Sequence, residues 1–83
     1  MPLIEIARAE TEDEAMAGLE RWKERHAGVW PLLEPRDVLV DKMRGRSSVW
    51  YRIRLNLQHV PEDQRPPQEQ LEVDYDPWAG FRT

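Results

Sequence analysis

The stretch from Val49 to Leu57 reads VWYRIRLNL and alternates between apolar residues and residues of other kinds. The apolar series is Val49, Tyr51, Ile53, Leu55 and Leu57, and between its members stand Trp50, Arg52, Arg54 and Asn56. A period of two predicts a β-strand that turns one face to a core and the other face away from it. The fold therefore needs a sheet that is covered on one side, and the other side carries a tryptophan and two arginines.

Two further segments resemble strands. DVLVDKM, residues 37–43, precedes the first stretch and is separated from it by the loop RGRSS, residues 44–48. Two strand-like segments around a short loop that contains glycine predict a β-hairpin. PLIEIARAE, residues 2–10, predicts another strand.

The segment between the first strand and the hairpin predicts a helix from about Glu12 to Ala27. Thr11 and Glu14 have the spacing of a capping box, in which each side chain accepts a backbone N–H at the start of a helix. Gly28 is a typical helix stop. The apolar stripe of the helix is expected to consist of Ala15, Met16, Leu19, Trp22 and His26, at spacings of three and four.

The connection VWPLLEPRD, residues 29–37, contains two prolines and leads to the hairpin. The order strand, helix, strand, strand predicts the α+β class. We expect residues 1–60 to form a small single domain in which one helix packs on a small antiparallel sheet.

Residues 61–83 differ in character and predict an extended, proline-rich acidic arm. Its last part carries the aromatic residues Tyr75, Trp78 and Phe81, and Pro77 stiffens the chain before Trp78. Aromatic residues on a stiff segment lose little entropy when they dock. Two alternatives remain: the arm folds back on its own sheet and covers Trp50, or it docks on a partner.

The composition bounds the kind of protein. The chain of 83 residues contains no cysteine and no apolar run of the length that a membrane helix needs, so we expect a cytoplasmic protein without a membrane segment. The start, MPLIEIARAE, is too charged for a signal peptide. Residues 1–28 carry a net charge of −3, residues 29–60 carry +3 and residues 61–83 carry −4, so a basic segment lies between two acidic ones.

No pattern of catalytic residues is found. The spacing of His26 and His59 matches no metal motif, and no third ligand that would complete a site with them is evident in the sequence. Ser47 and Ser48 lie in an arginine-containing loop, which suits a turn or a phosphorylation site better than a nucleophile. The glycine patterns that bind nucleotides are absent. We therefore expect no catalytic residue, no cofactor and no metal, and a protein that is not an enzyme by itself.

The most specific pattern is the face formed by Trp50, Arg52 and Arg54. Tryptophan and arginine are enriched in protein interfaces, but they also stack on the bases of single-stranded nucleic acid, and they occur on ordinary protein surfaces. The net charge of −4 disfavours nucleic acid. We expect an accessory subunit that binds a larger protein or another copy of itself, with a nucleic-acid-binding module as the alternative. The expected interface residues are Trp50, Arg52, Arg54, Tyr75, Trp78 and Phe81.

Overall fold

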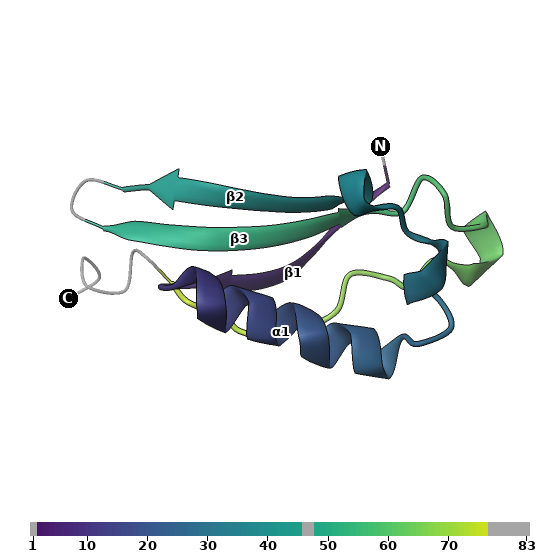
Figure 1. Ribbon diagram of the computed structural model, residues 1–83, viewed down its shortest axis with the longest axis horizontal. Coiled ribbons are helices and arrows are strands. Elements are labelled where there is room, and N and C mark those ends of the chain that lie inside the picture. Colours follow the sequence, from purple (N-terminus) through teal and green to yellow (C-terminus); the bar gives the residue numbers. More distant parts are fainter. Residues whose placement is uncertain (1, 46–47, 77–83) are drawn as a thin grey trace.

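The computed structural model describes residues 2–45 and 48–76. It contains three strands and one α-helix, in the order expected from the sequence (Figure 1). The elements are β1 (Leu3–Ala9), α1 (Glu12–Arg25), β2 (Val38–Arg44) and β3 (Val49–Asn56), with short 3-10 turns at Trp30–Leu32, Pro35–Asp37 and Glu62–Gln64. The predicted α+β class, with one helix packed on a small antiparallel sheet, is confirmed.

The sheet has the order β1-β3-β2, and both of its pairs are antiparallel. The predicted hairpin is therefore present, and β3 is the central strand. This position accounts for the alternation in its sequence, because Ile53 and Leu55 are fully buried under α1 while their neighbours Arg52 and Arg54 are only half-buried. The helix contacts β1 and β3 and lies along one side of the sheet (Figure 1).

Strand β1 contains a β-bulge at Ile6. Glu5 lies opposite Arg54 and Ala7 lies opposite Ile53, so Ile6 is the extra residue. A bulge shifts the alternation of the strand by one residue. Ile6 and Ala7 are consequently both buried, and the following residue, Arg8, returns to the face that carries Glu5.

Helix α1 begins as the sequence predicted and ends slightly earlier. The hydroxyl of Thr11 accepts a hydrogen bond from the backbone N–H of Glu14 at 3.2 Å, and it donates to the Glu14 carboxylate at 3.1 Å. The helix ends at Arg25, with His26 as the C-cap, rather than at Ala27.

The buried stripe of α1 differs from the predicted one at Met16 and Gly18. Ala15, Leu19 and Trp22 are buried as expected, but Met16 is 36% exposed and Gly18 is buried instead. Gly18 lies close against β1, and a Cβ atom there would lie 3.2 Å from the Cβ of Ala7.

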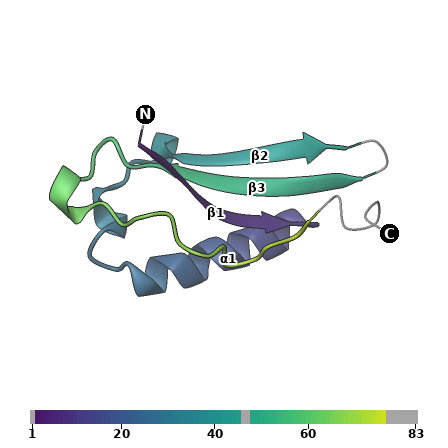
Figure 2. The same ribbon diagram turned by 180° about the vertical axis from the view of Figure 1, so that it is seen from behind.

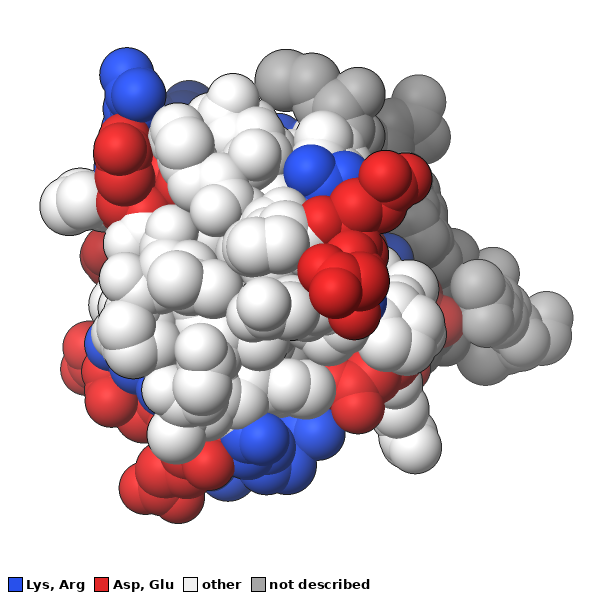
Figure 3. Space-filling model, turned by 90° about the vertical axis from the view of Figure 1, so that its right-hand side faces the viewer, with Lys and Arg blue, Asp and Glu red and all other residues white. Residues whose placement is uncertain are grey.

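The connection from α1 to β2 and the start of the arm lie at one end of the sheet (Figure 1). Trp30 and Leu33 pack against the core there, while Leu32 remains 37% exposed. Seen from this end, the middle of the surface shows no Lys, Arg, Asp or Glu, and the charged residues lie around it (Figure 3).

The arm runs beside β1 and along α1 (Figure 2). Its backbone pairs with β1 in parallel, with a bridge between Arg8 and Asp74. The hydrogen bonds run from the N–H of Glu72 to the carbonyl of Ile6 at 2.9 Å, from the N–H of Arg8 to the carbonyl of Val73 at 2.8 Å, and from the N–H of Tyr75 to the carbonyl of Arg8 at 2.9 Å. The arm thus extends the sheet as an irregular outer strand, and the bulged residue Ile6 supplies one of the acceptors.

Replacing Thr11 by alanine tests the helix cap. The variant Thr11→Ala should lower the free energy of unfolding by about 1 kcal/mol, because the N–H of Glu14 loses its acceptor. Urea denaturation measures the change. Thr11→Ser keeps the hydroxyl and should remain close to the unsubstituted protein. Equal losses in both variants would contradict the assignment.

Candidate interaction surface

The face of the sheet opposite α1 is built by alternate residues of the three strands. Across the sheet, Glu5 lies opposite Arg54, which lies opposite Leu39; Arg8, Arg52 and Asp41 form the next row, and Trp50 lies opposite Met43. Residues that lie directly opposite each other in antiparallel strands share a face. We call the side formed by Leu3, Glu5, Arg8, Leu39, Asp41, Met43, Trp50, Arg52 and Arg54 the open face.

Both arginines of β3 bind one carboxylate. The Oδ2 atom of Asp41 lies 3.2 Å from an Nη atom of Arg52 and 2.9 Å from an Nη atom of Arg54. The Nε atoms of Arg52 and Arg54 are buried and have no hydrogen-bond partner in the part of the chain that the structure describes. Each guanidinium is therefore held in place through an Nη atom. The carboxylate of Asp41 on β2 balances part of the positive charge of β3.

The third arginine of the open face is paired as well. Arg8 donates two hydrogen bonds to Glu5, at 2.9 and 2.8 Å, and this contact depends on the bulge that places both side chains on one face. The hydrogen bond to Glu5 is the main cause that raises the pKa of the Arg8 guanidinium above its usual value. The charged residues of the open face thus form two groups of ion pairs within the sheet, one of Glu5 with Arg8 and one of Asp41 with Arg52 and Arg54.

Apolar side chains border these ion pairs. Trp50 and Met43 lie opposite each other near the tip of the hairpin, and Leu3 and Leu39 lie toward the other end of the sheet. All four are half-buried. No helix or strand of residues 2–45 and 48–76 packs across this face as α1 packs across the other.

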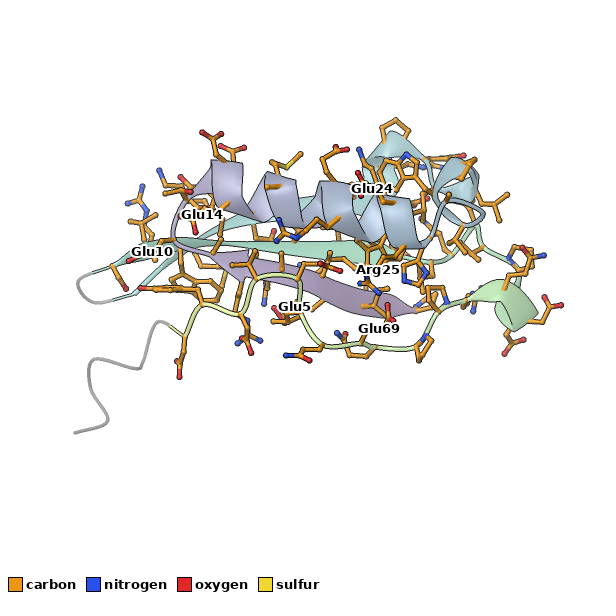
Figure 4. The ribbon with its side chains drawn as sticks, turned by 90° about the horizontal axis from the view of Figure 1, so that it is seen from below. Glu5, Glu10, Glu14, Glu24, Arg25 and Glu69 are labelled. Atoms are coloured by element: carbon orange, nitrogen blue, oxygen red, sulfur yellow. The ribbon has the colours of Figure 1, made fainter. Side chains whose placement is uncertain are left out.

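The arm is fastened to α1 by ion pairs. The carboxylate of Glu72, whose side chain is 13% exposed, binds Arg25 and lies 3.4 Å from Arg21. Glu69 binds Arg25 at 3.3 Å and the ring of His26 at 2.7 Å (Figure 4). The hydrogen bond from His26 lowers the pKa of Glu69, with Arg25 adding to the effect against the opposing influence of desolvation.

A shallow hollow of about 310 Å³ lies between the arm and the helix end. Its lining consists of Arg25, Glu69, Gln70, Leu71 and Glu72. The charged groups of this lining are paired with one another. The hollow is therefore a consequence of how the arm is attached to α1 and not a candidate active site.

Four of the six residues expected at an interface lie in the described part of the chain. Trp50, Arg52 and Arg54 share the open face, as the alternation indicated. Tyr75 lies on the arm beside Arg8 of its own domain and is half-buried. Trp78 and Phe81 lie outside the described residues. The described part of the arm thus follows the first of the two alternatives in folding back on its own sheet, along the edge of β1.

A second polar cluster lies where β2 begins. The buried carboxylate of Asp37 accepts hydrogen bonds from the backbone N–H of Glu34 at 2.9 Å and from the side chain of Gln58 at 2.8 Å, and it lies 2.7 Å from Nδ1 of His59. Burial alone would raise the pKa of Asp37, but these hydrogen bonds outweigh it and lower the pKa to about 2. The sequence pattern did not lead to this cluster, although Glu34 and Asp37 flank a proline at the spacing of a capping box.

The cluster around Asp37 joins the two ends of the hairpin rather than forming a reactive centre. Asp37 orients the ring of His59, as a carboxylate does in a catalytic pair, but its other bonds close a 3-10 turn and hold the end of β3. Among the described residues there is no group of three or more His, Cys, Asp or Glu side chains that could hold a metal ion. No helix in the described part of the chain is long and apolar enough to cross a membrane.

Comparison with known proteins adds no relative. No protein-family model matches the chain, and neither a curated protein nor a solved structure matches it. The function must therefore be argued from the residues themselves.

The Asp37 cluster predicts a specific loss of stability in acid. Because the pKa of Asp37 is about 2 in the folded protein and 3.8 in the usual case, its stabilising effect is complete above pH 4 and disappears as the pH falls toward 2. In Asp37→Asn, the free energy of unfolding should be lower at pH 7 and should change less between pH 4 and pH 2. Denaturation at several pH values measures this, and Asp63→Asn, in an exposed turn, is the control. Identical pH profiles for Asp37→Asn and the unsubstituted protein would contradict the prediction.

The ion pairs of Glu72 predict how firmly the arm is held. Glu72→Gln should lower the free energy of unfolding by about 1 kcal/mol, because it removes the negative charge of a largely buried side chain that pairs with Arg21 and Arg25. Asp74→Asn removes the same charge from an exposed position of the arm and should change stability far less. Urea denaturation compares the two variants, and equal effects would mean that the contact with α1 contributes nothing specific.

Proposed function

We propose that this protein is a small, non-catalytic accessory subunit that binds a larger protein through the open face of its sheet. The observation that supports the proposal is the open face itself, on which half-buried Trp50 and Met43 stand beside arginines whose positions are set by Asp41. An interface anchor is most effective when it is already held in its bound position. The absence of cysteine from the sequence suits a subunit of a cytoplasmic assembly.

The pairing of the arginines favours a protein partner over nucleic acid. Affinity for nucleic acid comes mainly from cations that neutralise phosphates. Arg8, Arg52 and Arg54 already bind Glu5 and Asp41 within the same face. A phosphate would have to displace or crowd these carboxylates, whereas a protein surface can bind the paired groups as they stand.

The end of the arm is also part of the proposed interface. Tyr75 bonds to Arg8, which lies opposite Arg52, so the described arm reaches the part of the sheet near Trp50. We propose that the aromatic residues of the arm, Tyr75, Trp78 and Phe81, add to the contact at this end of the molecule.

A comparison of two apolar truncations tests the proposal. The tagged protein is used to capture its partner from its native lysate, with mass spectrometry to identify it, and the affinity for the purified partner is then measured. Trp50→Ala should weaken binding by roughly 2 kcal/mol, about 30-fold, if Trp50 is an anchor. Leu32→Ala removes an exposed apolar side chain in the connection between α1 and β2 and should leave the affinity unchanged.

Two results would overturn the proposal. The first is a partner that binds Trp50→Ala as tightly as the unsubstituted protein. The second is binding of a single-stranded oligonucleotide at physiological salt that is lost in Trp50→Ala, which would favour the nucleic-acid-binding alternative.

A further inference from the structure

Two cations of the hairpin have no partner within the described structure. Of the lysine and arginine side chains in residues 2–45 and 48–76, all but Lys42 and Arg44 bind a carboxylate or donate a hydrogen bond. Both residues are on β2 and both are exposed. In a chain that pairs its other described cations internally, two adjacent unpaired ones indicate a surface that is available to an anion.

Apolar side chains lie beside these cations on the same face of the sheet. Lys42 lies opposite Tyr51, and Arg44 lies opposite Val49, which is 43% exposed. Val40 precedes them on the same face of the strand and is 40% exposed, although it lies opposite the buried Ile53. Val40 is exposed because α1 packs on β1 and β3 and leaves β2 uncovered.

The backbone of β2 also has an unoccupied side. In the described structure β2 pairs with β3 alone, whereas the opposite edge of the sheet, at β1, pairs with the arm. An edge strand exposes a row of unpaired N–H and C=O groups that an extended peptide can bind. The side of β2 away from β3 therefore offers backbone hydrogen bonds beside Val40, Lys42 and Arg44.

The arm shows which kind of chain this sheet accepts. At β1 an extended acidic segment bonds through its backbone to Ile6 and Arg8, while its carboxylates at Glu69 and Glu72 bind cations of α1. At β2 the same two elements, an open strand edge and unpaired cations, are present without an occupant among the described residues.

The charges on β2 act against two of the symmetric pairings with a second copy of the chain. If two β2 strands paired antiparallel about Asp41 or Lys42, identical charges would lie directly opposite each other, which destabilises a pair. Exposed charge on an edge strand also discourages the addition of purely apolar strands. A strand with carboxylates at the right spacing gains from the same cations.

We propose that β2 binds an extended acidic segment of a partner protein, which adds to the sheet as a strand. Its carboxylates lie at Lys42 and Arg44, and an apolar side chain lies against Val40. The inference rests on the proposed function, because the segment belongs to the same partner that covers the open face, and it adds the chemistry by which that partner is recognised.

The test uses the full chain and a defined probe. The probe is a peptide of about seven residues in which one valine and two glutamates occupy successive alternate positions, so that all three side chains lie on the face of Val40, Lys42 and Arg44, and its counterpart contains lysine in place of glutamate. Backbone amide resonances of the protein are followed by NMR during titration to millimolar peptide. The acidic peptide should shift the resonances of residues 38–44 in a saturable manner, and the lysine peptide should not.

Charge reversal provides the matched variants. Lys42→Glu should weaken binding of the acidic peptide at least tenfold. Arg36→Glu changes the charge equally at an exposed position outside β2 and should leave binding unchanged. The inference is overturned if β2 resonances do not respond to the acidic peptide, if both peptides shift them equally, or if the two variants lose the same affinity.

A third variant separates this inference from the proposed function. Trp50 lies on the open face, while Val40 and Lys42 lie on the face of α1, so Trp50→Ala should bind the acidic peptide as the unsubstituted protein does. Loss of peptide binding in Trp50→Ala would contradict the assignment to β2. If the peptide does not bind but Trp50→Ala still loses the captured partner, the strand addition is wrong and the accessory-subunit proposal stands.

Discussion

A single helix covers only one face of this sheet, and that constraint determines the rest of the structure. Helix α1 packs on β1 and β3, where Ile53 and Leu55 become fully buried. With no second layer in the described chain, the other face must be stable in contact with water. It is built of ion pairs bordered by half-buried apolar side chains, and Asp41 alone binds both arginines of the central strand. The paired arginines and half-buried apolar side chains, which suit this face to an interface, are thus what the sheet presents where no second layer of the described chain covers it.

The same shortage applies to the edges of the sheet. One edge is closed by the arm, which bonds to the bulged strand β1 and is held against α1 by Glu69 and Glu72. The arm can lie this close to α1 because Gly18 has no side chain. A Cβ atom at Gly18 would lie 3.2 Å from the Cβ of Glu72. The arm is therefore a structural part of the domain as far as it is described. The other edge, at β2, has no such cover in the described residues.

The sequence predicted the features that depend on local patterns. The alternation around Ile53, the Thr11 cap and the pairing of β2 with β3 each depend on residues close together in the sequence, and the structure confirms them. The sequence of β1 could not show the bulge at Ile6. Two apolar residues in succession interrupt the alternation of a strand, but they do not indicate that one of them is the extra residue of a bulge. Nor could the sequence show that Gly18, and not Met16, belongs to the buried stripe, since the depth of the contact between helix and sheet decides that.

The candidate site was predictable in part for the same reason. The shared face of Trp50, Arg52 and Arg54 follows from the strand period, but their pairing with Asp41 depends on the register between β2 and β3. The contact between Asp37 and His59 joins residues 22 positions apart, and the alignment of the arm on β1 joins residues more than 60 positions apart. Contacts of this kind come from the tertiary arrangement and leave no local pattern in the sequence.

The central claim is that the arm completes one edge of the sheet and leaves the open face and β2 to a partner. Hydrogen exchange of individual backbone amides in the isolated protein tests it most directly. The account predicts that the amides of Glu72 and Tyr75, which donate to Ile6 and Arg8, exchange at least about 100-fold more slowly than in an unfolded peptide. Exchange of both amides at the unfolded rate, with the amides of β3 still protected, would show that the arm does not belong to the domain and would contradict the account.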